Sequence, residues 1–154
     1  MSQEYLNSVD DIINNKNFNK LKYERHHYAT NRYEHSLEVS YKAYKICKKL
    51  NLDYESVARA ALLHDYFFDS DFTVNRGKRI FVHYKKSLEN ANEIVNLTKK
   101  EENIIASHMF PIGGQLPRCI ESVIVNAVDD VISIKERLRM NYKNIKKLVL
   151  NSLL

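Results

Sequence analysis

Residues 54–65 read YESVARAALLHD, an apolar run of helical length that ends in an adjacent histidine and aspartate, His64 and Asp65. Asp53 precedes the run as a candidate N-cap, and the alanines within it allow neighbouring helices to approach closely. We therefore predict a central helix here. A carboxylate at the end of such a helix is costly to bury unless it is paired or binds a metal ion.

Helical spacing of apolar residues continues on both sides of this run. A further helix should start at the capping-box sequence Thr98-Lys99-Lys100-Glu101 and carry His108 on its inner face. Residues 66–82 lose the period, contain Gly77 and are predicted to form a long loop. The other predicted helices span about 3–14, 33–50, 85–96, 118–137 and 141–154.

Only three glycines and two prolines occur in the 154 residues, which favours helices over a sheet-rich fold. We predict an all-α, single-domain bundle of about six to seven helices over residues 1–154. Its core should span about 25–137, and the last helix, about 141–154, should close the bundle.

Composition excludes several classes of protein. No apolar run is long enough to span a membrane, and the polar N-terminus does not look like a signal peptide, so we expect a cytoplasmic protein with no membrane partner. Cys47 and Cys119 are expected to be buried thiols rather than a disulfide. The net charge of +5 is spread over helical faces, which favours an anionic small substrate over nucleic acid.

Four more polar residues fall at positions that the pattern predicts to be buried. His35 opens a helix, His83 follows the long loop, His108 lies on an inner helix face, and Asp129 lies among valines and isoleucines. Each histidine alone is more often a core residue than a ligand, but the joint pattern with His64-Asp65 is specific. Imidazole and carboxylate together suit iron, manganese, zinc or cobalt, and the lack of thiolate ligands argues against a closed structural zinc site.

The pattern resembles the HD superfamily of metal-dependent phosphohydrolases, named for the adjacent His-Asp. The resemblance covers about residues 25–137 and is closest to the subgroup with two extra histidines, which includes bacterial symmetrical diadenosine tetraphosphate hydrolases. It rests on the segments RYEHSLEVS, ARAALLHDYFFD, FVHYKKSLENA, IIASHMFPIGG and VNAVDDVIS. It also implies an all-helical bundle, in agreement with the periodicity.

By this resemblance, His35, His64, Asp65 and Asp129 would hold a first metal ion. Asp65 would also act in catalysis and bridge to a second ion completed by His83 and His108. The implied cofactor is one or two divalent ions (Fe, Mn, Zn, Co or Mg), which would activate water for attack on a small phosphate substrate such as a nucleotide.

Phosphate binding also needs fixed positive charge, and two places offer it. Arg76, Lys78 and Arg79 lie in the predicted loop, and Arg32 precedes the helix of His35. Each could instead be a solvated surface residue. Many relatives carry a lysine three residues after the HD aspartate, where this chain has Phe68.

Three functions therefore stay open on the sequence. The first is a metal-dependent phosphohydrolase. The second is a di-iron oxygenase built on the same site. The third is a non-enzymatic nucleotide- or nucleic-acid-binding regulatory module. The exact substrate, the metal and the oligomeric state are left open as well.

Overall fold

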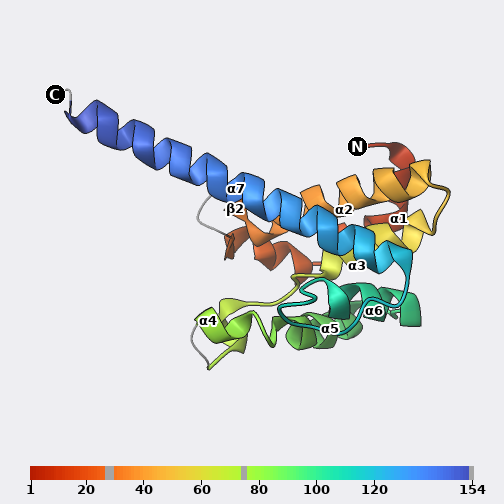
Figure 1. Ribbon diagram of the computed structural model, residues 1–154. Helices are drawn as coiled ribbons and strands as arrows, with labels where there is room; N and C mark the ends of the chain where they lie inside the picture. The colour runs from red at the N-terminus through yellow and green to blue at the C-terminus, as the bar shows by residue number, and fades with distance from the viewer. Residues whose placement is uncertain (27–29, 74–75, 153–154) are drawn as a thin grey trace.

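The structure, a computed structural model, describes residues 1–26, 30–73 and 76–152, without the side chains of residues 76 and 147–152. It is all-α, as predicted, apart from one two-stranded sheet (Figure 1). The elements are α1 (Gln3–Ile13), the 3-10 helix η1 (Phe18–Tyr23), β1 (Arg25–His26), β2 (Thr30–Asn31), α2 (Arg32–Lys49), α3 (Tyr54–Leu63), the 3-10 helix η2 (Asp69–Asp71), α4 (Arg76–Arg79), α5 (His83–Ile94), α6 (Lys99–Ser107) and α7 (Ile120–Ser152).

Helix α3 is the centre of the bundle, which confirms the helix predicted from residues 54–65. It contacts α1, α2, α5, α6 and α7, and six of its ten residues are buried. Its alanines let α2 lie close alongside, and the Asp53 side chain caps it by accepting from the Ser56 backbone N–H at 3.2 Å. The helix ends at Leu63, so His64 and Asp65 lie in the interior where several helix ends meet.

The capping box predicted before α6 is present. The Thr98 hydroxyl accepts from the Glu101 backbone N–H at 3.2 Å, and the Glu101 carboxylate accepts from the Thr98 N–H at 2.7 Å. These two bonds satisfy backbone groups that a helix start otherwise leaves unpaired. They fix where α6 begins and therefore where His108, directly after it, lies.

The described residues of the segment 66–82 include two short helices, η2 and α4, so the prediction of a long loop was wrong in part. Polar contacts of one side chain stabilise η2. The Asp71 carboxylate accepts from the Phe68 backbone N–H at 2.8 Å and from the Asn90 amide at 3.1 Å. The short sheet in which β1 pairs with β2, Arg25 opposite Asn31 and His26 opposite Thr30, was not predicted either.

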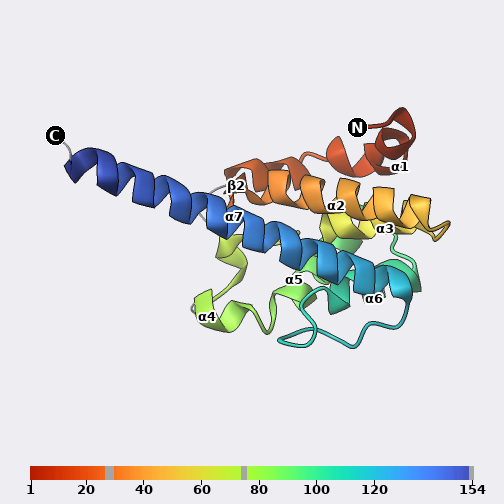
Figure 2. The same ribbon diagram turned by 45° about the horizontal axis from the view of Figure 1, so that its top comes forward.

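The end of the chain differs most from the prediction. A single helix, α7, replaces the two helices predicted over 118–137 and 141–154. No glycine or proline separates these segments, so nothing ends the first helix. The prediction that the last helix closes the bundle was wrong, because the second half of α7 projects beyond the bundle (Figures 1 and 2).

The cysteines and the membrane-spanning character of the helices were the subject of two predictions from composition. Both cysteines are free thiols, Cys47 buried as expected and Cys119 partly exposed. Among the described residues, no helix combines the length and the apolar character needed to cross a membrane.

Candidate metal centre

The six residues predicted as metal ligands converge on one place from five parts of the chain. All six are buried, with at most 7% of each residue exposed. They come from α2 (His35), from the end of α3 (His64 and Asp65), from the start of α5 (His83), from the end of α6 (His108) and from the middle of α7 (Asp129).

Three of them form a first cluster. The His35 Nε2 lies 2.9 Å from the Asp129 Oδ1, and the His64 Nε2 lies 3.6 Å from the same oxygen. One donor atom from each of these residues falls within 4.8 Å of the others, close enough to share one cation.

The other three form a second cluster next to the first. The Asp65 Oδ1 lies 3.4 Å from the His83 Nε2 and 3.6 Å from the His108 Nε2. The second carboxylate oxygen of Asp65 lies 4.0 Å from the His64 Nε2, which belongs to the first cluster. Asp65 is therefore placed between the two clusters.

Backbone carbonyls orient three of the imidazole rings. The Nδ1–H groups of His64, His83 and His108 face the carbonyl oxygens of Ala61, Arg79 and Ile105 at 2.7, 3.0 and 2.7 Å. When a neutral ring donates through Nδ1, its Nε2 carries a lone pair, and here every Nε2 faces the centre.

This orientation leaves an electrostatic problem that a cation would solve. The Nε2 atoms of His83 and His108 lie 2.8 Å apart, so two lone pairs oppose one another unless a proton or a metal ion lies between them. The His64 Nε2 and the Asp65 Oδ1 are buried without any hydrogen-bond partner among the described residues. The donor set therefore fits divalent cations held by imidazole and carboxylate.

Sequence reasoning missed two residues of this site, His26 and Glu136. The Glu136 carboxylate accepts from the Thr30 hydroxyl at 3.1 Å and lies 3.3 Å from the His35 Nδ1. The His26 ring stacks on His35 with centroids 3.8 Å apart, and its Nδ1 lies 3.7 Å from the Asp65 Oδ2. His26, His35 and Glu136 form a third group of possible ligands.

A signal for Glu136 existed in the sequence. It follows Asp129 by seven residues, which places both on the same face of one helix. His26 lies in β1, outside any helical period, so periodicity offered no means of finding it.

The balance between burial and neighbouring carboxylates shifts the pKa values of two histidines in opposite directions. Burial alone lowers the pKa of His35, but its hydrogen bonds to Asp129 and Glu136 outweigh this and raise it to about 10. Burial dominates at His83 and lowers its pKa to about 4. Burial also opposes ionisation of Asp65 and Asp129, yet the histidines around them hold both pKa values well below the usual range.

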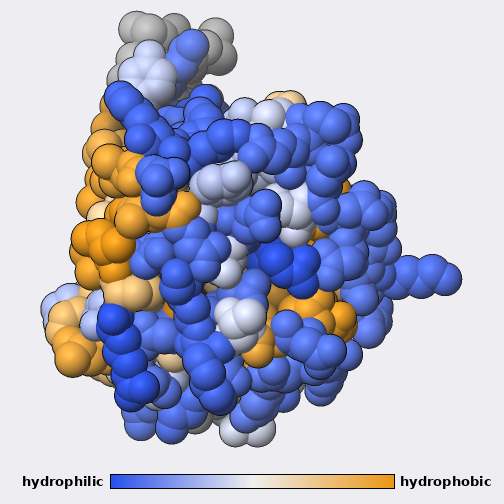
Figure 3. All heavy atoms as spheres, turned by 90° about the vertical axis from the view of Figure 1, so that its right-hand side faces the viewer, coloured by the Kyte–Doolittle hydropathy of each residue, from blue (hydrophilic) through white to orange (hydrophobic). Residues whose placement is uncertain are grey.

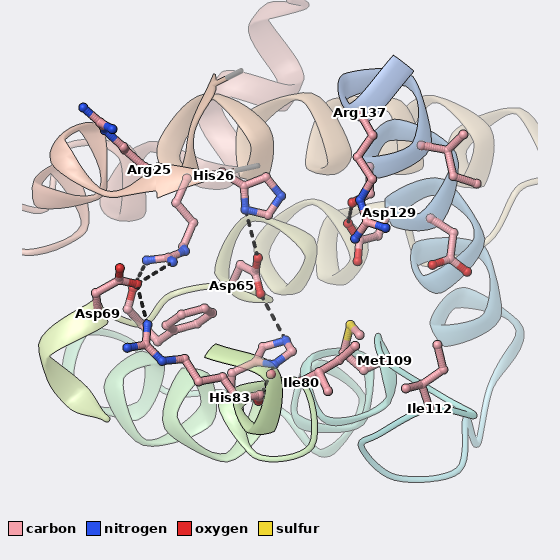
Figure 4. A pocket seen from close by; sticks show the side chains of 17 residues that line it. Arg25, His26, Asp65, Asp69, Ile80, His83, Met109, Ile112, Asp129 and Arg137 are labelled. Carbon is pink, nitrogen blue, oxygen red and sulfur yellow. Dashed lines mark hydrogen bonds and ion pairs between the residues drawn. The ribbon is translucent and has the colours of Figure 1, made fainter. Parts of the chain in front are cut away.

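A cavity of about 590 Å³ opens beside these clusters (Figure 4). Asp65, Asp129, His26 and His83 contribute to its polar lining. The apolar lining consists of Phe67, Ile80, Met109, Ile112 and Ile134. Of the aromatic residues 66–68, only Phe67 lines the cavity, whereas Tyr66 and Phe68 pack in or against the core.

The arginine Arg32, predicted to bind substrate, is occupied by contacts within the protein. It is buried, pairs with Glu24 at 3.2 Å and Asp69 at 3.1 Å, and donates to the Phe67 carbonyl at 2.9 Å. Arg79 lines the cavity but also pairs with Asp69, at 2.9 Å.

Lys78 and Arg76 were also predicted to bind substrate, and neither has a described side chain that lines the cavity. Lys78 is exposed and is absent from the lining. The side chain of Arg76 lies outside the described part of the structure.

Two arginines without a predicted role in the site also line the cavity, Arg25 and Arg137. Figure 4 shows Arg137 extending from α7 toward Asp129, whereas the Arg25 side chain points away from the clusters. Arg137 makes no hydrogen bond or ion pair to any other described residue, so its charge is available to a ligand.

A model of the HD domain family matches residues 32–133, well over half of the chain. The chain belongs to the HD-domain family. The match spans α2 to the first half of α7 and contains all six converging residues, while His26 and Glu136 lie just outside it. HD domains typically bind divalent metals and act as metal-dependent phosphohydrolases. Comparison with curated proteins and with solved structures found no match.

Proposed function

We propose that this HD-domain protein is a metal-dependent hydrolase of a nucleotide or another small phosphate ester, with water as the nucleophile. The observation that carries the proposal is the convergence of two clusters of ligand-type side chains, joined by Asp65, beside one cavity. Its volume falls within the range of about 300–1,000 Å³ typical of small-molecule sites.

The proposed ligands follow the two clusters. His35, His64, Asp65 and Asp129 would hold one ion, and Asp65, His83 and His108 would hold the other. This is the six-ligand arrangement of the subgroup that includes symmetrical diadenosine tetraphosphate hydrolases. Divalent ions bound there would lower the pKa of a shared water and neutralise phosphoryl oxygens as charge develops.

The protein's own residues supply orientation and charge. The carbonyls of Ala61, Arg79 and Ile105 fix the rings of the three histidines, and Glu136 does the same for His35. Arg137 would bind a phosphate oxygen beside Asp129, and the apolar lining of the cavity would contact the uncharged part of the substrate. A cavity with one charged side and one apolar side supports a substrate with one anionic and one apolar part.

The direct test is to count metal ions per chain and to screen substrates with the ion found. We expect two ions per chain, falling to about one in His83→Ala and His108→Ala. The loaded protein should hydrolyse at least one member of a panel of nucleoside mono-, di- and triphosphates, dinucleoside polyphosphates and p-nitrophenyl phosphate. Metal-loaded protein that turns over none of them would contradict the proposal, as would a chain that binds no metal after reconstitution.

Replacing Arg137 and Arg32 with alanine should give different results. Loss of a charge-assisted bond of about 1.5–3 kcal/mol in Arg137→Ala should raise KM by about 10- to 100-fold, with a smaller loss of Tm than in Arg32→Ala. Arg32→Ala should instead destabilise the fold by about 2 kcal/mol, because the Phe67 carbonyl loses its donor and the ion pairs of Arg32 with Glu24 and Asp69 are lost.

Arg139→Ala is the matched control, since Arg139 is exposed on the same helix and does not line the cavity. Steady-state kinetics and thermal unfolding of the three variants make the comparison. An unchanged KM in Arg137→Ala would remove this residue from the substrate site.

A further inference from the structure

Helix α7 carries a stripe of exposed apolar residues along its whole described length. The stripe consists of Ile120, Val123, Ala127, Val131, Ile134, Leu138, Tyr142 and Ile145. Apart from Ala127, each is a large side chain between 48% and 68% exposed. Figure 3 shows hydrophobic side chains gathered in a band along this side of the molecule.

The spacing of these residues keeps them on one face of a straight helix. The steps between them are three, four, four, three, four, four and three residues, an average close to the 3.6 residues of one turn. The buried residues Val125 and Ile132 occupy the opposite face, against the bundle. The stripe therefore faces away from the core of the bundle, and Ile134 lies at the edge where the stripe meets the cavity.

Beyond Arg137, the second half of α7 is largely uncovered by the described residues of the chain. Between residues 137 and 146, only Met140 is even partly covered, and the helix projects beyond the bundle (Figures 1 and 2). An isolated helix of about 15 residues is only marginally stable in water. Packing of the stripe against another apolar surface would stabilise it.

The stripe is complementary to itself. When two α7 helices lie antiparallel with their midpoint between residues 132 and 133, every stripe residue meets another. The facing pairs are Ile120 with Ile145, Val123 with Tyr142, Ala127 with Leu138, and Val131 with Ile134. This is the property of a twofold interface, in which one patch contacts its own copy.

Charge beside the stripe fits the same arrangement. Asp130 and Arg137 are seven residues apart and so lie on the same flank of the helix, where both line the cavity. In the antiparallel pair, Asp130 of each copy lies on the same flank as Arg137 of the other, about 3 Å from its level along the helix axis. This intermolecular charge pair occurs twice in the dimer, once on each side of the twofold axis.

We propose that two copies of this chain associate through the α7 stripes in an antiparallel pair. The interface would border the cavity of each copy, because Asp130, Ile134 and Arg137 belong to both. A lipid surface also accepts an apolar helix face with basic neighbours. It would leave the acidic Asp130 beside the stripe unexplained.

Light scattering of the full chain over a range of concentrations tests the association. We expect twice the chain mass of 18.1 kDa, and at least tenfold weaker association in Leu138→Asp. Asn144→Asp is the matched control, because it adds the same charge at an exposed position of α7 outside the stripe. Leu138 is exposed, so both variants should keep the helical content of the original chain. A monomer at all concentrations would overturn the proposal.

Disulfide trapping tests the direction and register of the pair in a Cys119→Ser background. A mixture of Ala127→Cys chains and Leu138→Cys chains should give a crosslinked heterodimer, whereas Leu138→Cys alone should not crosslink. Crosslinking of Leu138→Cys to itself would indicate a parallel pair and overturn the arrangement. Binding of monomers to phosphatidylserine vesicles, lost in Leu138→Asp, would assign the stripe to lipid and also overturn it.

Charge reversal examines the flanking pair independently. Asp130→Arg and Arg137→Asp should each weaken association, and the double variant should restore it, since each copy then presents the opposite charges in exchanged places. Failure of the double variant to recover would contradict the antiparallel register. None of these measurements depends on hydrolytic activity.

Discussion

Asp65→Asn is expected to remove both metal ions and to lower kcat/KM by at least about 1,000-fold. The Asp65 Oδ1 faces His83 and His108, and its Oδ2 faces the first cluster. The neutral amide keeps the shape of the side chain but offers no negative charge to either ion. Without the ions, the transition state loses several kcal/mol of stabilisation, which corresponds to this factor in rate.

Two further variants make the Asp65 result specific. Asp129→Asn should remove one ion and leave the cluster of Asp65, His83 and His108 able to hold the other. Asp130→Asn, next in the chain but outside all three ligand groups, should keep both ions. Elemental analysis of the three proteins, each checked for helical content, gives the comparison. Two ions retained by Asp65→Asn would refute its bridging position.

Metal binding is expected to release a proton from His35 at neutral pH. In the metal-free protein this ring lies between Asp129 and Glu136, and these carboxylates raise its pKa to about 10 against the effect of burial. A metal ion needs the deprotonated Nε2, so it must displace a proton, and its affinity should increase as the pH rises from about 6.5 toward 10. Calorimetry in two buffers with different ionisation enthalpies measures the proton release.

The same shift has an opposite consequence for the stability of the metal-free protein. Because the folded-state pKa of His35 is raised, its contribution to stability is fully present below the unfolded value of about 6.5 and is lost as the pH rises through about 10. The raised pKa of His108, where Asp65 outweighs the effect of burial, acts in the same direction. Thermal unfolding in chelator should therefore show a Tm that falls over this window.

Glu136→Gln provides the control for both measurements. It removes one of the two carboxylates that face His35 and leaves Asp129 in place. The fall in Tm should then be smaller and end at a lower pH, because the folded-state pKa of His35 is raised less. Metal affinity should weaken by about 10- to 100-fold, as is usual when a partner that orients a ligand is lost. A metal-free Tm that stays level between pH 6.5 and 10 in the original protein would contradict the assigned state of His35.

Much of the fold could be predicted from the sequence, because local signals specify helices. The alanine- and leucine-rich run before His64-Asp65 has the length and period of a buried helix, and α3 is that helix. The capping box at Thr98 and Glu101 fixed a helix start through contacts only three residues apart. The joint spacing of histidines and aspartates also indicated which residues come together.

Contacts that join distant parts of the chain could not be predicted in this way. In the sequence, Arg32 looks like a free cation at the start of the helix that carries His35. In the structure it pairs with Glu24 and Asp69 and donates to the Phe67 carbonyl. The contribution of Arg137 to the cavity depends on how α7 lies across the bundle. His26 reaches the site only because β1 pairs with β2 and places its ring on His35.

The sequence by itself determined that this chain forms helices, that α3 is buried and that His64 and Asp65 end in the interior, since these properties depend on periodicity and on neighbours a few residues away. Only the tertiary structure decided that Glu136 and His26 join the centre, that Arg32 is occupied, and that α7 continues past the bundle with an apolar face exposed. The physical reason is that burial and charge pairing depend on which distant surfaces meet, and local spacing does not record this.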